Sequence, residues 1–177
     1  MCLANKKSIF TAGSILLGLL LGSQTGQASE CKVIKTTLDG ASFLCGDSPV
    51  GLCADGVISS GILKGTKTAV YTAAAPSAGL WTEGPSVLSY TADAVFTTND
   101  GELYLSQLGV LDTLRQVFTE LNRVVGGTGR FDQASGDLFI SGTVNSSNIA
   151  TEFESDVTGT VCLNISNDED DDSDDDD

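Results

Sequence analysis

The stretch Val124-Val125-Gly126-Gly127-Thr128-Gly129-Arg130-Phe131 limits the fold more strongly than any other part of the chain. Glycine favours positions where φ is positive or where another backbone comes close. The segment 134–145 that follows alternates in the manner of a strand. The stretch also lacks the Lys-Ser/Thr ending of a phosphate-binding loop and precedes no helix. It therefore predicts a sharp structural corner between two strands.

Alternating apolar and polar residues, bounded by turn signals, predict short strands over most of the remaining chain. The segment 108–125 is ambiguous, because an apolar stripe at helical spacing coincides with Val, Phe and Thr residues that favour strands. We divide it into a turn or short helix at 109–115 and a strand at 116–125. The other predicted strands cover 55–63, 66–75, 87–98, 101–107, 137–145 and 149–163. This succession predicts an all-β sandwich or barrel.

Residues 1–28 have the pattern of a secretory signal peptide. Lys6 and Lys7 precede a short apolar run at 15–21, and Ala28 ends a small-residue cleavage pattern. The run is shorter than a typical membrane span, so we expect cleavage and a secreted or periplasmic protein without a stable span. A retained anchor is the alternative.

Three further segments follow the signal. We predict a loop-like, disulfide-linked N-terminal extension at 29–52 and a β-domain at 53–166. The tail, 167–177, contains eight Asp and one Glu and buries nothing apolar, so we expect it to be disordered.

Composition excludes several kinds of chemistry. The net charge is −15, so the chain has no basic patch suited to nucleic acid. Histidine is absent, which excludes Ser-His-Asp catalysis and His-ligated zinc. We expect neither a metal nor another cofactor.

Four cysteines remain after the predicted signal: Cys31, Cys45, Cys53 and Cys162. An even number in an exported chain favours two disulfides over a metal site. Spacing alone leaves all three connectivities open.

The corner stretch, with Ala134 and Gly136 after it, resembles the V-V-G-G-T-G-x-F-x-x-A-x-G signature of dirigent proteins. It is also similar to the corresponding stretch of allene oxide cyclases and their bacterial barrel-like relatives. The resemblance covers about residues 53–163. It implies an eight-stranded antiparallel, calycin-like barrel with a central cavity. Related barrels are often trimers, so a homo-oligomer is a further expectation.

Barrel closure also implies a disulfide pairing, because the first and last strands would pair. On that basis we prefer Cys53–Cys162 with Cys31–Cys45, and the alternative is Cys31–Cys162 with Cys45–Cys53.

Two departures from the signature bear on function. Asp132 and Ser135 occupy positions where plant dirigent proteins commonly carry arginine. We therefore expect an exported barrel that binds a small apolar ligand, or acts as a structural or interaction module, without catalysis. The alternative is a cofactor-free isomerase or cyclase, or a dirigent-type protein that guides a reaction in the cavity.

The remaining acid/base candidates are strand carboxylates: Asp93, Glu120, Glu152 and Glu154. Asp93 is the one we consider for an inward position, although an outward aspartate is the more common arrangement. Catalytic residues otherwise stay unknown. The aromatic residues that could line a cavity or fill the core are Tyr71, Trp81, Tyr90, Phe96 and Tyr104.

Overall fold

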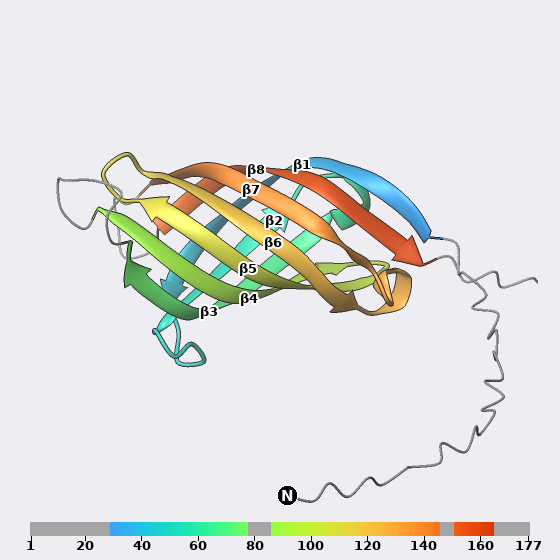
Figure 1. Ribbon diagram of the computed structural model, residues 1–177, viewed down its shortest axis with the longest axis horizontal. Coiled ribbons are helices and arrows are strands. Elements are labelled where there is room, and N and C mark those ends of the chain that lie inside the picture. Colours follow the sequence, from blue (N-terminus) through green and yellow to red (C-terminus); the bar gives the residue numbers. More distant parts are fainter. Residues whose placement is uncertain (1–28, 78–85, 146–150, 165–177) are drawn as a thin grey trace, which may run out of the picture.

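The computed structural model describes residues 29–77, 86–145 and 151–164. Eight strands form a closed antiparallel barrel in which each strand pairs with its neighbours in sequence (Figure 1). Two 3-10 helices, η1 (Gly61–Leu63) and η2 (Gly129–Phe131), join strands at one end. The strands are β1 (Ser29–Leu44), β2 (Leu52–Ile58), β3 (Gly65–Pro76), β4 (Val87–Thr98), β5 (Gly101–Asp112), β6 (Val117–Gly127), β7 (Ser135–Asn145) and β8 (Thr151–Asn164).

Pairing of β1 with β8 closes the barrel. The register runs from Ser29 opposite Asn164 to Ser42 opposite Thr151, and Figure 1 shows the two strands side by side. Every strand is thereby hydrogen-bonded to two neighbours, although the β1–β2 ladder covers only Leu38–Leu44 of β1. The predicted all-β fold with antiparallel strands is confirmed.

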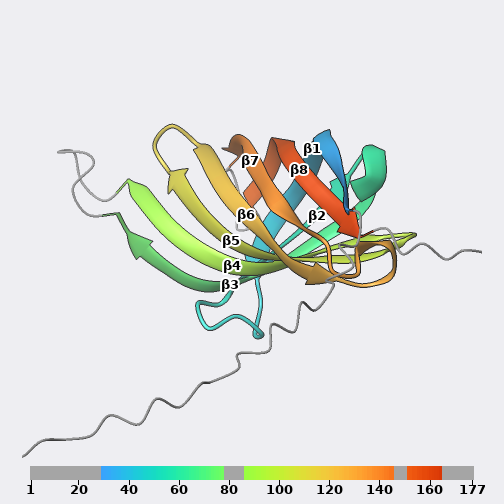
Figure 2. The ribbon, with the colours of Figure 1, turned by 45° about the vertical axis from the view of Figure 1, so that its right-hand side comes forward.

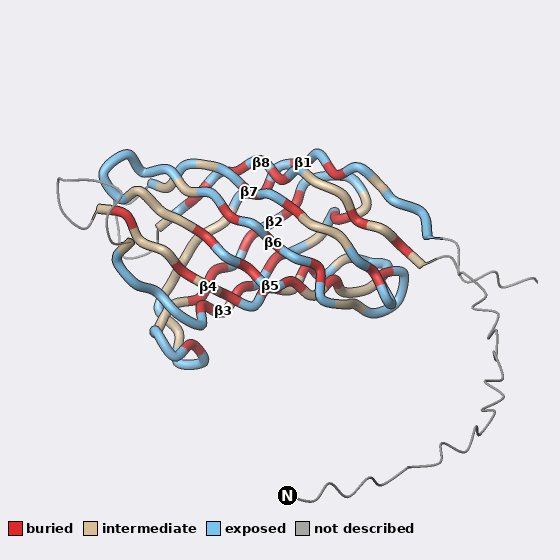
Figure 3. Tube along the Cα trace, viewed as in Figure 1, coloured by how far each residue is buried: buried red, intermediate tan, exposed pale blue. Residues whose placement is uncertain are grey.

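Buried and exposed residues alternate along much of the strands, as the colours of Figure 3 show. In β1, for example, Ile34, Thr36 and Leu38 are buried while the residues between them are exposed. The interior is mainly aliphatic and aromatic, with Leu38, Phe96, Leu103, Phe131, Leu138, Ile140, Val157 and Val161 among its most deeply buried members.

The glycine corner helps to close one end of the barrel. β6 ends at Gly127, and η2 then places Phe131 in the core with no exposed surface. Leu63 of η1 is buried at the same end, which Figure 2 turns towards the viewer. Gly129 has φ +57°, and a Cβ there would lie 2.3 Å from the backbone oxygen of Asp100. The predicted structural corner is confirmed.

The prediction of a loop-like extension at 29–52 is wrong, because residues 29–44 form β1, the longest strand. The Asp39-Gly40 pair is typical of a turn in sequence but lies inside β1. A Cβ on Gly40 would lie 2.2 Å from the oxygen of Asp55 and 2.6 Å from the Phe153 ring. Gly40 is therefore a close approach inside a strand. The barrel begins at Ser29, and only 45–51 forms a loop.

Two strand boundaries also need correction. The predicted turn or short helix at 109–115 is wrong in its first half, because β5 continues to Asp112 before a turn at 113–116. The predicted first strand at 55–63 is β2, which begins at Leu52 and ends at Ile58, followed by η1. The strands predicted at 66–75, 87–98, 116–125 and 137–145 are confirmed within a few residues.

The disulfides are Cys31–Cys162 and Cys45–Cys53, so the preferred pairing is wrong and the alternative is correct. The preference assumed that the first strand starts at Cys53. Because β1 is the true first strand, Cys31 lies directly opposite Cys162 in the β1–β8 ladder. Cys45 and Cys53 flank the short β1–β2 loop instead.

Several predictions concern residues outside the described part of the chain: the signal peptide at 1–28, the acidic tail at 167–177 and the environment of Trp81. Within residues 29–77, 86–145 and 151–164, no helix has the length and apolar character needed to cross a membrane.

Candidate functional site

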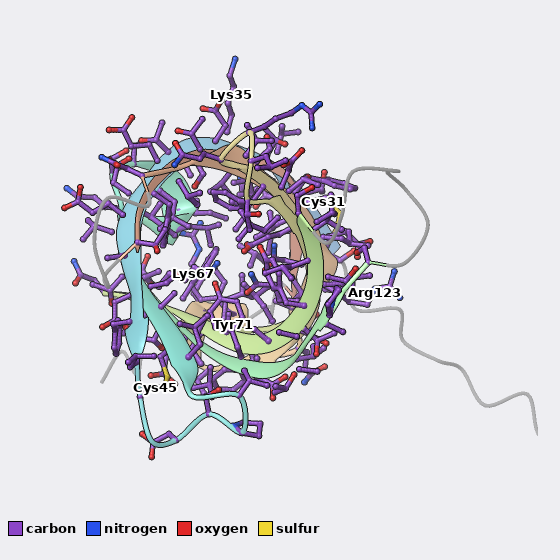
Figure 4. The ribbon with its side chains drawn as sticks, turned by 90° about the vertical axis from the view of Figure 1, so that its left-hand side faces the viewer. Cys31, Lys35, Cys45, Lys67, Tyr71 and Arg123 are labelled. Atoms are coloured by element: carbon purple, nitrogen blue, oxygen red, sulfur yellow. A yellow bond between two sulfur atoms is a disulfide. The ribbon has the colours of Figure 1, made fainter. Side chains whose placement is uncertain are left out.

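A cavity of about 150 Å³ lies at the end of the barrel opposite η1 and η2. Figure 4 looks into this end and shows Lys67 and Tyr71 inside the ring of strands, with Lys35 and Arg123 outside. Most of the lining is apolar, and the polar groups are few. The lining residues are Leu38, Ser42, Leu52, Ala54, Lys67, Tyr71, Ala74, Leu88, Tyr90, Leu111, Phe118, Glu120, Val144, Thr151 and Phe153.

An ion pair crosses the interior of the barrel. Lys67 of β3 and Glu120 of β6 belong to strands that are not neighbours, yet Lys67 Nζ lies 3.2 Å from Glu120 Oε2. Each side chain is only 4% exposed. Burying two charges is costly unless they are paired and hydrogen-bonded, so this arrangement is a demanding one for a protein interior.

Tyr90 is hydrogen-bonded to the other carboxylate oxygen of Glu120. Its hydroxyl donates to Glu120 Oε1 at 2.8 Å. In the ladders Tyr90 lies opposite Gly109 and Gly109 lies opposite Glu120, so the ring passes over a glycine. A Cβ on Gly109 would lie 2.2 Å from Tyr90 Cζ. Gly109 therefore provides the space that lets Tyr90 reach Glu120.

Tyr71 completes the polar part of the cavity. Its ring meets the ring of Tyr90 edge-on, with centroids 5.2 Å apart. The β1–β2 loop supports this strand, because Ser48 Oγ donates to the backbone carbonyl of Tyr71 at 2.6 Å. The Cys45–Cys53 disulfide closes the same loop. Tyr71 is thus positioned by the Tyr90 ring and by the β1–β2 loop.

Both tyrosines are held in the neutral form. Burial, reinforced by the negative charge of Glu120, raises the pKa of Tyr71 from 10.0 to about 12, although the Ser42 hydroxyl acts in the opposite direction. Burial also raises the pKa of Tyr90, and the charge of Glu120 adds to the effect. At neutral pH both hydroxyls are therefore hydrogen-bond donors.

Two amides lie next to the ion pair along β5 and β6. Gln107 and Asn122 face each other across the ladder, and both are buried. None of their four side-chain nitrogen and oxygen atoms has a hydrogen-bond partner among the described residues. Buried amides usually have partners, so these two form an unusually polar patch in the core.

The sequence-based candidates divide clearly. Asp93 is exposed on the outer face of β4, which contradicts an inward position. Glu152 and Glu154 are exposed on β8. Glu120 is the one carboxylate of the four that enters the cavity.

The aromatic candidates divide in the same way. Tyr71 and Tyr90 line the cavity, whereas Phe96 is buried in the core and does not line the cavity. Tyr104 lies half-buried on the outer face of β5, where its hydroxyl donates to Glu102 at 2.9 Å.

Sequence reasoning missed Lys67, Gln107 and Asn122. Lys67 shares an alternating face with Ala69 and Tyr71, and this pattern was an available signal. Long charged side chains are usually exposed, however, and the alternation of residues along one strand does not show which side chain lies opposite on a distant strand of the barrel.

The described residues contain no group of three or more His, Cys, Asp or Glu side chains arranged to hold a metal ion. Comparison with known proteins found no matching protein family, no matching curated protein and no matching solved structure. The cavity is an apolar pocket whose inner end carries the side chains of Lys67, Glu120, Tyr71 and Tyr90.

Proposed function

We propose that the barrel binds a small, mainly apolar ligand in this cavity. The observation that carries the proposal is the contrast between an apolar lining and a compact polar group at its inner end. Ligand sites typically combine apolar walls with a few placed polar groups that orient the ligand. A purely structural barrel of this size would more simply fill its interior with apolar side chains.

The polar groups favour a ligand that accepts hydrogen bonds. Both oxygens of Glu120 are already engaged, by Lys67 and by Tyr90. An ammonium has three donors, and among the described side chains only Glu120 accepts from Lys67. Tyr71 adds a neutral hydroxyl. A carbonyl or ether oxygen would therefore be the best polar group for the ligand.

We further infer that the chain is an exported member of the allene oxide cyclase and dirigent-like barrels. The glycine signature of residues 124–136 and the closed antiparallel barrel support this kinship. Two disulfides are typical of oxidising compartments, which supports a secreted or periplasmic location.

A second candidate is proton-transfer chemistry in the cavity, of the isomerase or cyclase kind. The favouring observation is the contact between Tyr90 and Glu120, which places a neutral acid beside a carboxylate in an apolar site. Such pairs can exchange protons with a bound substrate. Ligand binding remains the first proposal, because it requires only the apolar cavity walls and the hydrogen-bond donors of Lys67 and Tyr71.

Native mass spectrometry of protein purified from its source tests the proposal, followed by thermal-shift assays with small carbonyl compounds. A matched pair of variants locates the site. Ala74→Phe places a bulky ring at the mouth, whereas Ala73→Phe changes a neighbour that is also exposed but does not line the cavity. We expect Ala74→Phe alone to weaken ligand binding. The absence of both a co-purified ligand and any thermal shift would refute ligand binding.

A further inference from the structure

Lys67 has an environment that suits covalent chemistry. Building on the proposed ligand-binding function, we propose that Lys67 forms a reversible imine with a small aldehyde or ketone bound in the cavity. This assigns a nucleophile and a substrate class to the site.

Burial sets Lys67 apart from the other described lysines. Lys67 is 3% exposed, whereas Lys35 and Lys64 are exposed and the Lys32 side chain is 37% exposed. Lysines that form imines in proteins are commonly desolvated in apolar pockets, because there the charged ammonium loses its hydration. Lys67 lies on the wall of a mostly apolar cavity that would admit a small carbonyl compound, and its carboxylate partner there is Glu120.

The neighbouring groups supply the proton transfers that imine formation requires. Glu120 Oε2, 3.2 Å from Lys67 Nζ, is placed to take a proton from the ammonium and so free its electron pair. Tyr90 donates to the other carboxylate oxygen and helps to hold Glu120 in position. Burial raises the pKa of Tyr71 to about 12, so its phenol stays neutral and its hydroxyl is available to donate a hydrogen bond to the carbonyl oxygen.

The step balances without an external oxidant or reductant. The freed amine attacks the carbonyl carbon, and the ammonium proton of the adduct moves to the former carbonyl oxygen, giving a carbinolamine. Glu120, now protonated, gives its proton to the carbinolamine hydroxyl, which leaves as water. A C=N bond replaces the C=O bond, the product is a protonated imine, and Glu120 is a carboxylate again. Water entering from the mouth reverses the sequence.

Reductive trapping tests the proposal on the full chain. The protein is incubated at neutral pH with benzaldehyde and sodium cyanoborohydride, and alkylation of each lysine is quantified by peptide mapping. We expect Lys67 to be alkylated about tenfold faster than Lys35 and Lys64, because Glu120 lies beside it as a general base. Alkylation of Lys67 at or below their rate would overturn the proposal.

Variants separate activation from mere access. Glu120→Gln should slow alkylation of Lys67 and leave that of Lys35 unchanged, and an unaltered rate at Lys67 would remove Glu120 from the mechanism. Ala74→Phe should also slow it, whereas Ala73→Phe should not. If Glu120→Gln fails to fold, the comparison of lysines in the unsubstituted chain still decides the matter.

Benzyl alcohol distinguishes failure of this inference from failure of ligand binding. It resembles benzaldehyde in size but cannot form an imine. If it raises the melting temperature while Lys67 shows no preferential alkylation, the cavity binds ligands and the imine proposal is wrong. If neither effect occurs, both proposals fail for this ligand class.

Discussion

The pairing of Lys67 with Glu120 depends on both partners being present. Removing one partner of a buried ion pair leaves an uncompensated charge, whereas replacing both with apolar residues can be neutral or stabilising. We expect Lys67→Met to lower the free energy of unfolding by about 3–5 kcal/mol. The Lys67→Met/Glu120→Leu double variant should recover most of that loss. Urea denaturation measures the free energy of unfolding of both variants. A double variant less stable than Lys67→Met would contradict the view that the loss comes from an unpaired buried charge.

Gly109 is a second residue whose role can be isolated. Because an added Cβ would lie 2.2 Å from the Tyr90 ring, Gly109→Ala forces that ring away from Glu120. Overpacking of this kind typically costs about 1–3 kcal/mol. Gly46→Ala is the control, since nothing lies within 4 Å of its Cβ. Equal stability of the two variants in denaturant titrations would mean that Tyr90 does not pass over Gly109.

Tyr71 couples stability to alkaline pH. Its pKa is about 12 in the folded protein against 10.0 for an unburied tyrosine, so folding favours the neutral phenol. Its contribution is therefore complete below pH 10 and is lost as the pH rises towards 12. We expect stability to fall in this window, and to fall less in Tyr71→Phe. Identical pH profiles of the two proteins in chemical denaturation would exclude this coupling.

At the scale of single residues, the sequence supported part of the site. Glu120, Tyr71 and Tyr90 were candidates because strands carry acid/base and aromatic side chains in recognisable alternation. Lys67 was not, because its position depends on a partner 53 residues away across the interior. Asp93 was considered for an inward position with the outward one as the more common arrangement, and it lies outward on β4.

At the scale of elements, strands bounded by clear turns were predictable and β1 was not. The strands predicted at 87–98 and 101–107 form the β4–β5 hairpin, with the Asn99-Asp100-Gly101 turn signal between them. In β1 the Asp39-Gly40 pair imitates a turn, although Gly40 is needed because Phe153 and the β2 backbone approach it. The missed strand also explains the incorrect disulfide pairing, because register decides which cysteines meet.

The two disulfides therefore constrain elements of very different span. Cys31–Cys162 joins the first and last strands across a sequence separation of 131, whereas Cys45–Cys53 spans only 8. In the chain-entropy model these are worth about 5 and about 2–3 kcal/mol respectively. We expect Cys31→Ser/Cys162→Ser to lower the melting temperature more than Cys45→Ser/Cys53→Ser. Calorimetry of the two variants tests this order, and the reverse order would show that loop length does not dominate.

At the scale of the whole molecule, the two ends of the barrel have separate tasks. The end with η1 and η2 is filled by Leu63 and Phe131, and the other end carries the cavity. The inward-facing side chains of the strands form one continuous hydrophobic core between the two ends. This division was only partly predictable, because the glycine signature indicates a corner but not which end of the barrel it closes.

Separation of the two ends makes stability and binding independently adjustable. Phe131→Ala should cost about 3–5 kcal/mol by opening a cavity in the closed end, while ligand affinity stays unchanged. Ala74→Phe should do the reverse, because an exposed surface position usually alters stability by less than about 0.5 kcal/mol. Since the two positions lie at opposite ends of the barrel, the double variant should show the sum of both effects. Denaturant titrations and calorimetric binding of benzyl alcohol measure the two quantities, and a loss of affinity in Phe131→Ala would show instead that the closed end shapes the cavity.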